Sequence, residues 1–300
     1  MNKTSFATVL KTYHGDLDYV ERLLPTYLSH NKDNIPLYLI VPDQDYSHFK
    51  SFINKNHYIY VITDEDVSKD YVSAFAYPEL KSSIGIINAG VSKLAFWETK
   101  LADNYFAIDS DMVFIRDFYY HDFIGPTGIP FLALSAYPEL KTDNFYYNRY
   151  WNSRDSSYQN VKTIVGLNNY QNLNTHNSQV MSSLILQDFK NNFLAPLSWT
   201  YADAMIFERY EFFWYAAWAQ KSKVTEINIR HDFVKMIQHQ GEHLMFFNAG
   251  FRESDFSRDY IGLIVNSNWS RQYGIIDFDN PPVEKYINIG AWAEWNQKIK

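Results

Sequence analysis

The sequence contains no cysteine among its 300 residues. This absence excludes disulfide bonds, thiolate nucleophiles, and zinc or iron–sulfur centres held by cysteine. A chain without thiols suits a reducing compartment, so we expect a cytoplasmic protein.

Long apolar runs and an excess of positive charge are missing as well. The densest apolar cluster, FFWYAAWA at Phe212–Ala219, is far shorter than the roughly 20 residues that a transmembrane helix needs. The 27 Lys and Arg residues are outnumbered by 34 Asp and Glu residues, which gives a net charge of -7. A nucleic-acid partner would require a basic surface to neutralise its phosphates. We therefore expect no transmembrane segment and no nucleic-acid partner.

Strand-like and helix-like patterns alternate through the first third of the sequence. The strand candidates are short and continuously apolar, and the helix candidates carry apolar residues three to four positions apart. This order predicts an α/β fold with a mostly parallel, Rossmann-like sheet flanked by helices, in which ligands bind beyond the carboxyl ends of the strands. The predicted strands are Phe6–Leu10, Leu37–Val41, Tyr58–Thr63 and Tyr105–Ile108. One predicted helix begins near Asp16, and two more span residues 46–54 and 88–101.

The remaining sequence is less regular. Residues 121–175 are rich in Gly, Pro, Asn and Tyr, which predicts long loops. No linker of Pro, Ser and Gly divides the chain, so we expect a single domain with two functional halves, residues 1–120 and 121–300. The later predicted elements are helices at Ser178–Phe189 and Phe207–Gln220, and a strand at Ile261–Val265.

The spelling Asp-x-Asp occurs five times, and one of the five pairs stands apart. Asp16 and Asp18 are typical of a helix start, where aspartate caps free backbone N–H groups. The segment YFAIDSDMVFIRDF places Asp109 and Asp111 between two apolar runs, the second of which, residues 112–115, is predicted as a strand rather than a helix. Local capping therefore does not explain this pair.

Asp109 and Asp111 are typical of a metal-binding pair. In extended backbone, residues two apart point the same way, so both carboxylates can converge at the end of a strand. Two like charges held together repel each other unless a cation lies between them. Mg²⁺ and Mn²⁺ bind one or two carboxylates and complete their coordination with water and phosphate oxygens. The pair therefore predicts a divalent cation that is bound together with a diphosphate.

The segment YFAIDSDMVFIRDF resembles the Asp-x-Asp segment of GT-A glycosyltransferases, which use a metal-bridged nucleotide-sugar. More narrowly, the chain resembles the uncharacterised DUF6492 family of GT-A-like proteins. The resemblance implies a GT-A-like fold and the transfer of a sugar from a nucleotide-sugar, most readily a UDP-sugar, to a glycan or glycolipid in surface polysaccharide synthesis, with Mn²⁺ or Mg²⁺ as cofactor. The other matching segments are KTYHGDLDYVERLLPTYL, YVITDEDV, GVSKLAFWE, THNSQVMS, EFFWYAAW and IGLIVNSNW.

The resemblance also implies which residues bind the donor. The loop after the first strand would hold the nucleotide, acids after the third strand would contact base or ribose, and a helical lysine would neutralise the diphosphate. These donor-binding residues are Lys11, Thr12, Tyr13, Asp64, Asp66 and Lys93, together with Asp109.

Catalytic and remaining metal-binding roles are implied in the second half of the chain. Glu211, which precedes an aromatic helix, would be the base that deprotonates the acceptor hydroxyl in an inverting transfer. A third metal ligand would come from His231, His239 or His243, among which the sequence does not choose. His176 would line the sugar site.

Two other classes of protein compete with this interpretation. His239–His243 reads HQGEH and fits the His-x-x-Glu-His pattern of zinc peptidases, with Glu242 as general base. Gly241 lies within the helix that this motif requires and costs about 1 kcal/mol relative to alanine. The second alternative is a non-catalytic GT-A-like protein that binds sugar without needing Asp109 or Asp111.

Overall fold

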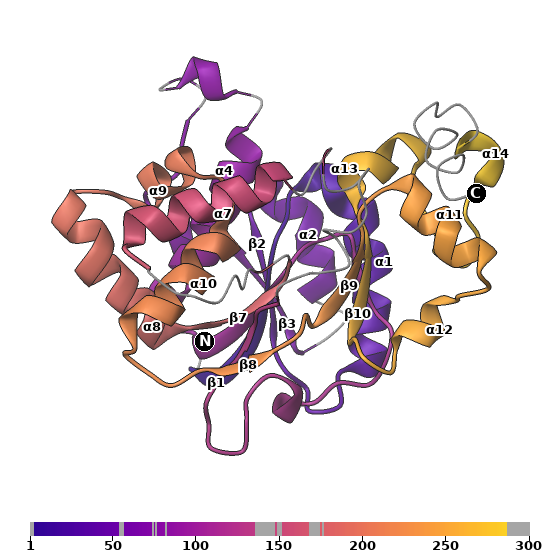
Figure 1. Cartoon of the computed structure of the whole chain (residues 1–300), viewed down its shortest axis with the longest axis horizontal. Helices are drawn as coiled ribbons and strands as arrows, with labels where there is room; N and C mark the ends of the chain where they lie inside the picture. Colours follow the sequence, from indigo (N-terminus) through magenta and orange to yellow (C-terminus); the bar gives the residue numbers. More distant parts are fainter. Residues whose placement is uncertain are drawn as a thin grey trace.

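A five-stranded sheet forms the centre of the protein, with the strand order β3-β2-β1-β4-β7 (Figure 1). Strands β3, β2, β1 and β4 are parallel to one another, and β7 runs antiparallel to β4. The computed structural model describes residues 3–53, 57–135, 152–167 and 177–286 apart from residues 74, 76 and 82, together with residues 148 and 175. The strands are β1 (Thr4–Lys11), β2 (Leu37–Val41), β3 (Ile59–Thr63), β4 (Ala102–Ile108) and β7 (Gln179–Ser182).

Helices cover both faces of this sheet. Successive residues of a strand point to opposite faces, so Val9 and Leu10 of β1 belong to different apolar clusters. Leu10 packs in the cluster formed with α1 and α2, whereas Val9 packs in the cluster formed with the helices on the other side. The covering helices are α1 (Leu17–His30) and α2 (Tyr46–Ile53) on one face, and α4 (Ile84–Ala95), α8 (Ser183–Phe189) and α10 (Glu211–Ser222) on the other.

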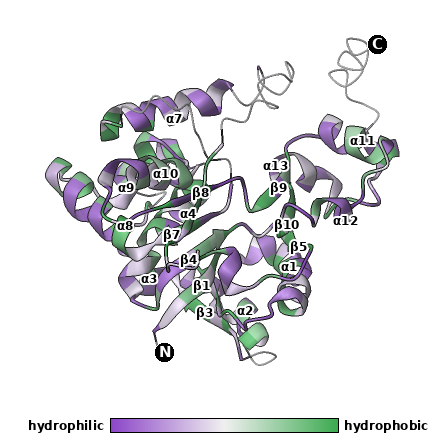
Figure 2. Cartoon of the chain, turned by 60° about the horizontal axis from the view of Figure 1, so that its bottom comes forward, coloured by the Kyte–Doolittle hydropathy of each residue, from purple (hydrophilic) through white to green (hydrophobic). Residues whose placement is uncertain are grey.

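Two smaller sheets contain the other described strands. The three-stranded sheet has the order β5-β10-β9, and Figure 2 shows its strands together beside α1 (Figure 2). The other pairs β6 with β8 in parallel. Their strands are β5 (Met112–Phe114), β9 (Val234–Ile237), β10 (Gly262–Val265), β6 (Phe131–Ala133) and β8 (Asn228–Arg230).

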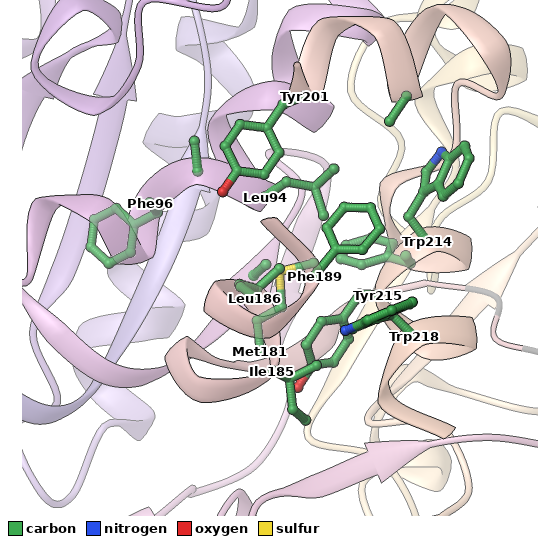
Figure 3. Close-up of a cluster of buried hydrophobic side chains, with 14 of the residues drawn as sticks. Leu94, Phe96, Met181, Ile185, Leu186, Phe189, Tyr201, Trp214, Tyr215 and Trp218 are labelled. Carbon is green, nitrogen blue, oxygen red and sulfur yellow. The ribbon is translucent and has the colours of Figure 1, made fainter. Parts of the chain in front are cut away.

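The aromatic run FFWYAAWA, at Phe212–Ala219, lies within α10 and belongs to the core. Trp214, Tyr215 and Trp218 point into a cluster with Phe189 and other apolar side chains of α4 and α8 (Figure 3). The polar atoms of these rings have partners: the Tyr215 hydroxyl oxygen accepts the Ser182 N–H at 2.8 Å. These rings therefore stabilise the fold and are not free to stack on a ligand.

The remaining described helices lie around these layers. None of the helices in the described part of the chain combines the length and the apolar character that crossing a bilayer requires. The remaining described α-helices are α3 (Asp64–Val67), α7 (Asn152–Val165), α9 (Tyr201–Phe207), α11 (Gln240–Asn248), α12 (Glu253–Phe256), α13 (Ser267–Ser270) and α14 (Val283–Tyr286).

The predicted α/β fold with a mostly parallel sheet is confirmed, but three local predictions are wrong in part. Residues 121–175, predicted as long loops, contain β6 and the helix α7, which no regular apolar pattern in this polar segment revealed. The helix predicted at Phe207–Gln220 begins only at Glu211, because α9 ends at Phe207.

The expected helix at Ser178–Phe189 begins only at Ser183, because Gln179–Ser182 forms β7. Val180 and Met181 point to opposite buried clusters, and their backbone pairs with the free edge of β4. Tertiary pairing thus overrides the helical spacing of these residues.

Candidate functional site

A cavity of about 770 Å³ opens where the parallel strands end. Its lining includes residues that directly follow β1, β2, β3 and β4, as expected for ligand binding in a parallel sheet. The size suits a small organic ligand. The residues after these strands are Thr12, Tyr13, Pro42, Asp64, Asp109, Ser110 and Asp111, and Lys11 is the last residue of β1.

Asp109 and Asp111 both line this cavity at the end of β4. The Ser267 N–H donates to Asp111 Oδ2 at 2.8 Å. Burial, as the larger cause, and the neighbouring charge of Asp109 together raise the pKa of Asp111 to about 6. The two carboxylates repel each other when both are ionised, and a bound cation would offset this repulsion.

The donor set at this position fits a hard divalent cation. Two adjacent carboxylates satisfy what Mg²⁺ or Mn²⁺ takes from a protein when water and phosphate oxygens complete the shell. Within the part of the chain that the structure describes, no group of three or more His, Asp or Glu side chains forms a metal cluster. Asp109 and Asp111 are therefore the pair of described side chains that would hold such an ion.

Lys93 joins Asp109 to Glu211 in an ion triad. Its Nζ donates to Asp109 Oδ1 and to Glu211 Oε1, both at 2.6 Å, and lies 4.7 Å from the centre of the Phe212 ring. Only 3% of the Lys93 side chain is exposed. Burial alone would lower the pKa of Lys93, but the two carboxylates outweigh it and raise the pKa above its ordinary value. Lys93 is therefore a charged ammonium group within the cavity wall.

Lys11 and Asp64 form a second buried pair in the cavity wall, at the ends of β1 and β3. Lys11 Nζ donates to Asp64 Oδ2 at 3.0 Å, and Ser92 Oγ lies 3.4 Å from Asp64 Oδ1. Burial lowers the pKa of Lys11 and raises that of Asp64, while their mutual attraction acts against both shifts. The neighbouring Thr12 is buried, and its hydroxyl has no hydrogen-bond partner within the described residues. A buried hydroxyl without a partner beside a cavity is suited to binding a ligand.

Tyr13 and Asp16 are connected by an arginine from late in the chain. Arg271 donates to the Tyr13 hydroxyl at 3.1 Å and to Asp16 Oδ1 at 2.5 Å, while Ser110 Oγ donates to Asp16 Oδ2 at 2.9 Å. The Tyr13 ring remains 40% exposed at the cavity. Asp16 forms no side-chain capping hydrogen bond at the start of α1. The predicted capping role is therefore wrong, and Asp16 is part of the cavity wall.

Asp66 is the predicted donor-binding residue that the structure places elsewhere. It is absent from the cavity lining, and its carboxylate accepts the Thr63 N–H at 3.0 Å in a reciprocal cap at the start of α3. The physical reason is that Asp66 occupies the third position of this short helix, from which its side chain reaches back to the cap residue.

Replacing Asp66 by alanine is expected to lower the free energy of unfolding by about 1 kcal/mol, because the cap is lost. Urea denaturation measures this change. Glu65→Ala is the matched control, since Glu65 is an exposed acid in the same turn and should change stability by no more than about 0.5 kcal/mol. Equal effects of the two substitutions would contradict the capping role.

The three candidate histidines do not reach Asp109 and Asp111. None of them lines the cavity. His231 Nε2 contacts the Asp259 carbonyl oxygen at 3.1 Å, and His243 Nε2 contacts the Phe278 carbonyl oxygen at 2.9 Å. His176 lies outside the described residues. A third metal ligand from these histidines is therefore not formed in this arrangement.

The zinc-peptidase site is not formed either. His239 precedes α11 as its cap residue, and its Nδ1 accepts the Glu242 N–H at 3.2 Å. The Glu242 carboxylate binds Lys235 Nζ at 2.8 Å and the Gln238 N–H at 2.6 Å. His243 is fully buried. Only one of the two histidines lies within the helix, so the two imidazoles do not share one helix face as the motif requires.

Several cavity residues were not predicted from the sequence. Asn177 is buried, and its Nδ2 donates to the Val234 carbonyl oxygen at 3.1 Å, while its Oδ1 has no partner within the described residues. Asn266, Ser267 and Asn268 follow β10 and belong to IGLIVNSNW, one of the segments that carry the family resemblance. That segment was the sequence signal from which these polar cavity residues could have been predicted. The unpredicted lining residues include Asp16, Arg154, Asn177, Arg209, Tyr210, Met236, Asn266, Ser267 and Asn268.

The mostly parallel sheet flanked by helices matches the fold of GT-A glycosyltransferase structures. No protein-family model matches the sequence, and no curated protein matches it. The fold is similar to that of the WbbM bifunctional glycosyltransferase, with a TM-score of 0.51 and 13% identity over 99% of this chain. The chain spans about half of that structure, 52% of its length.

Two further solved structures are similar at lower scores. Mouse xyloside xylosyltransferase 1 has a TM-score of 0.46 and 10% identity, and covers 88% of this chain and 99% of its own. The mannosyltransferase Ktr4p from S. cerevisiae has a TM-score of 0.43 and 12% identity, and covers 70% of this chain and 64% of its own. At these identities, the comparison with WbbM establishes the shared fold.

Proposed function

We propose that the protein is a metal-dependent glycosyltransferase that moves a sugar from a nucleotide-sugar, a UDP-sugar first of all, to a glycan or glycolipid acceptor. The observation that carries this proposal is the cavity at the strand ends, where the Asp109–Asp111 pair faces the same space as Lys11 and Lys93. Acids for a cation and ammonium groups for a diphosphate are the two requirements of such a donor. The likeness of the fold to a glycosyltransferase supports the same class.

The donor would lie along the side of the cavity formed by residues 1–120. Tyr13 offers an exposed ring to the base, Thr12 an unpartnered hydroxyl, and the Lys11–Asp64 pair a charged contact to ribose or phosphate. Asp109 and Asp111 would hold Mn²⁺ or Mg²⁺. When bound, this ion stabilises the negative charge of the departing nucleoside diphosphate.

Glu211 would act on the acceptor side, which residues 121–300 provide. The acceptor oxygen forms a bond to the anomeric carbon while the bond from that carbon to the diphosphate breaks, and Glu211 takes the hydroxyl proton. Lys93 Nζ donates a hydrogen bond to Oε1 of Glu211, so the proton would go to Oε2. Such a single displacement inverts the anomeric configuration. NMR of the product tests this step, and retained configuration would exclude Glu211 as a simple base.

Thermal unfolding in the presence of UDP tests the proposed donor site. UDP together with Mn²⁺ is expected to raise the melting temperature by about 5 °C, since a ligand at 100 times its Kd stabilises the native state by about 2.7 kcal/mol. Mn²⁺ alone and UDP alone should each have a smaller effect. A panel of UDP-sugars with Mn²⁺ then identifies the donor.

UMP with Mn²⁺ is the control for the diphosphate. It retains the base and ribose but lacks the group that a cation at Asp109 and Asp111 would bridge, so it should stabilise the protein less than UDP. Equal shifts for UDP with and without Mn²⁺ would contradict a metal-bridged donor. A sugar-binding protein without transferase activity would respond to free glycans and not to UDP.

A further inference from the structure

The exposed ring of Tyr13 is held in a fixed place at the cavity. It lies against the backbone of Gly15, where an added Cβ would come within 2.4 Å of the ring carbon Cε2. Its hydroxyl oxygen accepts a hydrogen bond from Nη1 of Arg271 at 3.1 Å. Tyr13 nevertheless remains 40% exposed and lines the cavity. It thus presents aromatic surface to the cavity, and the contacts with Gly15 and Arg271 set the orientation of that surface.

Arg271 is itself held in place. Its Nη2 forms an ion pair with Asp16 Oδ1 at 2.5 Å, and its guanidinium carbon lies 5.2 Å from the centre of the Tyr19 ring. Asp16 Oδ2 accepts a further hydrogen bond from the Ser110 hydroxyl at 2.9 Å, and the Asp16 side chain is only 13% exposed. A planar guanidinium group donates to its acceptors in a fixed geometry. The position of the Tyr13 hydroxyl is therefore tied, through Arg271, to a largely buried acid.

The surroundings of Arg271 do not suit direct contact with a ligand. Arg271 is absent from the cavity lining, and Asp16 balances its charge. Lys11 and Lys93 are ion-paired as well, but both of them line the cavity. An effect of Arg271 on a ligand would therefore pass through the residues that it holds, and Tyr13 is the one that offers an exposed ring.

We infer that Arg271 is a positioning residue, which holds the Tyr13 ring as a preformed stacking platform for the base of a nucleotide. Bases stack on aromatic side chains through their π-faces. A side chain that is already ordered loses less conformational freedom when the ligand binds, so a brace that never touches the ligand still raises its affinity. This inference rests on the proposed function, because it assigns the base of the donor to Tyr13.

Isothermal titration with two probes, UDP and pyrophosphate, each in the presence of Mn²⁺, tests the platform. Pyrophosphate carries the diphosphate without base or ribose, so the ratio of the UDP affinity to the pyrophosphate affinity reports the base and ribose alone. Arg271→Gln and Tyr13→Phe should each lower this ratio about 5-fold, because the ring must then be ordered on binding. General damage to the fold would instead weaken both probes.

The double variant gives the decisive comparison. Because Arg271 acts through the Tyr13 hydroxyl, adding Arg271→Gln to Tyr13→Phe should lower the ratio no further. Arg258→Gln is the matched control: its side chain is 90% exposed and it is absent from the cavity, so the ratio should not change. If Arg271→Gln fails to fold, Tyr13→Phe still tests the platform, since it leaves the ion pair of Arg271 with Asp16 in place.

Gly15→Ala tests the other side of the platform. The backbone of Gly15 is not among those with a positive φ, so alanine suits the turn, but its Cβ would displace the Tyr13 ring. This variant should also lower the ratio of the two affinities and leave the pyrophosphate affinity unchanged.

Three outcomes would overturn the inference. The ratio could be unchanged in Arg271→Gln and Tyr13→Phe, the losses could add in the double variant, or UDP could bind the unaltered protein no more tightly than pyrophosphate. Equal UDP affinity with and without Mn²⁺ would contradict the metal-dependent transferase instead. In that case the same ratio, measured without Mn²⁺, still tests the platform.

Discussion

Replacing Lys93 by methionine is expected to lower the free energy of unfolding by about 3 kcal/mol. The ammonium group neutralises Asp109 and Glu211, and its removal leaves two neighbouring carboxylates without a partner. Loss of one member of a buried ion pair costs about 3–5 kcal/mol. We expect the lower end of this range because 39% of the Asp109 side chain is exposed, so water can solvate that carboxylate. The Glu211 side chain is only 11% exposed and accounts for most of the cost. Chemical denaturation with urea measures the change.

Lys190→Met is the matched control for this substitution. Lys190 is paired with Glu98 at 2.7 Å, but 42% and 32% of the two side chains are exposed. Surface pairs of this kind contribute at most about 1 kcal/mol. Adding Glu211→Gln to Lys93→Met should recover about 1 kcal/mol, because a buried charge is removed. If Lys93→Met costs no more than Lys190→Met, the triad does not stabilise the fold.

Replacing Asp111 by asparagine is expected to slow sugar transfer by about 10²–10³-fold. In the proposed mechanism Asp111 helps to neutralise charge on the leaving diphosphate, and the loss of one such stabilising group typically costs this much in kcat. The asparagine side chain still offers an oxygen to the Ser267 N–H, so the fold should be kept. Turnover of the donor found in the thermal screen, measured with and without Mn²⁺, checks the prediction.

Asp18→Asn is the control for the same type of substitution. Asp18 belongs to another Asp-x-Asp pair, is exposed and is absent from the cavity. Its substitution should leave turnover unchanged. Unaltered turnover in Asp111→Asn would remove the proposed role of the pair, and a retained dependence on Mn²⁺ would point to other ligands for the ion.

Local patterns in the sequence predicted the central sheet well. Short apolar strands separated by amphipathic helices specify a parallel sheet with little ambiguity, and β2 was predicted residue for residue at Leu37–Val41. The helix predicted to begin near Asp16 is α1, which runs from Leu17 to His30 with Pro25 inside it. The position of Asp109 and Asp111 at a strand end also followed from local sequence alone.

The partners of the site residues could not be predicted in this way. Asp16 and Asp66 share the same local spelling, yet one lines the cavity and the other caps a helix. Asp16 is bound by Arg271, which lies 255 positions later in the chain. Similarly, the 118 positions between Lys93 and Glu211 hide their contact from any local pattern. Such pairings arise from tertiary packing, which a single sequence does not display.

The contribution of Ser267 and Arg271 to the cavity has a consequence for synthesis of the protein on the ribosome. Strands β1 to β4 emerge early, and domains fold from the N-terminus as the chain grows. The N–H that fixes Asp111 and the guanidinium that fixes Asp16 come from the last part of the chain. A nascent chain could therefore complete much of its central sheet and still lack an assembled ligand site. Binding competence would then be acquired abruptly, once residues 267–271 have left the ribosome.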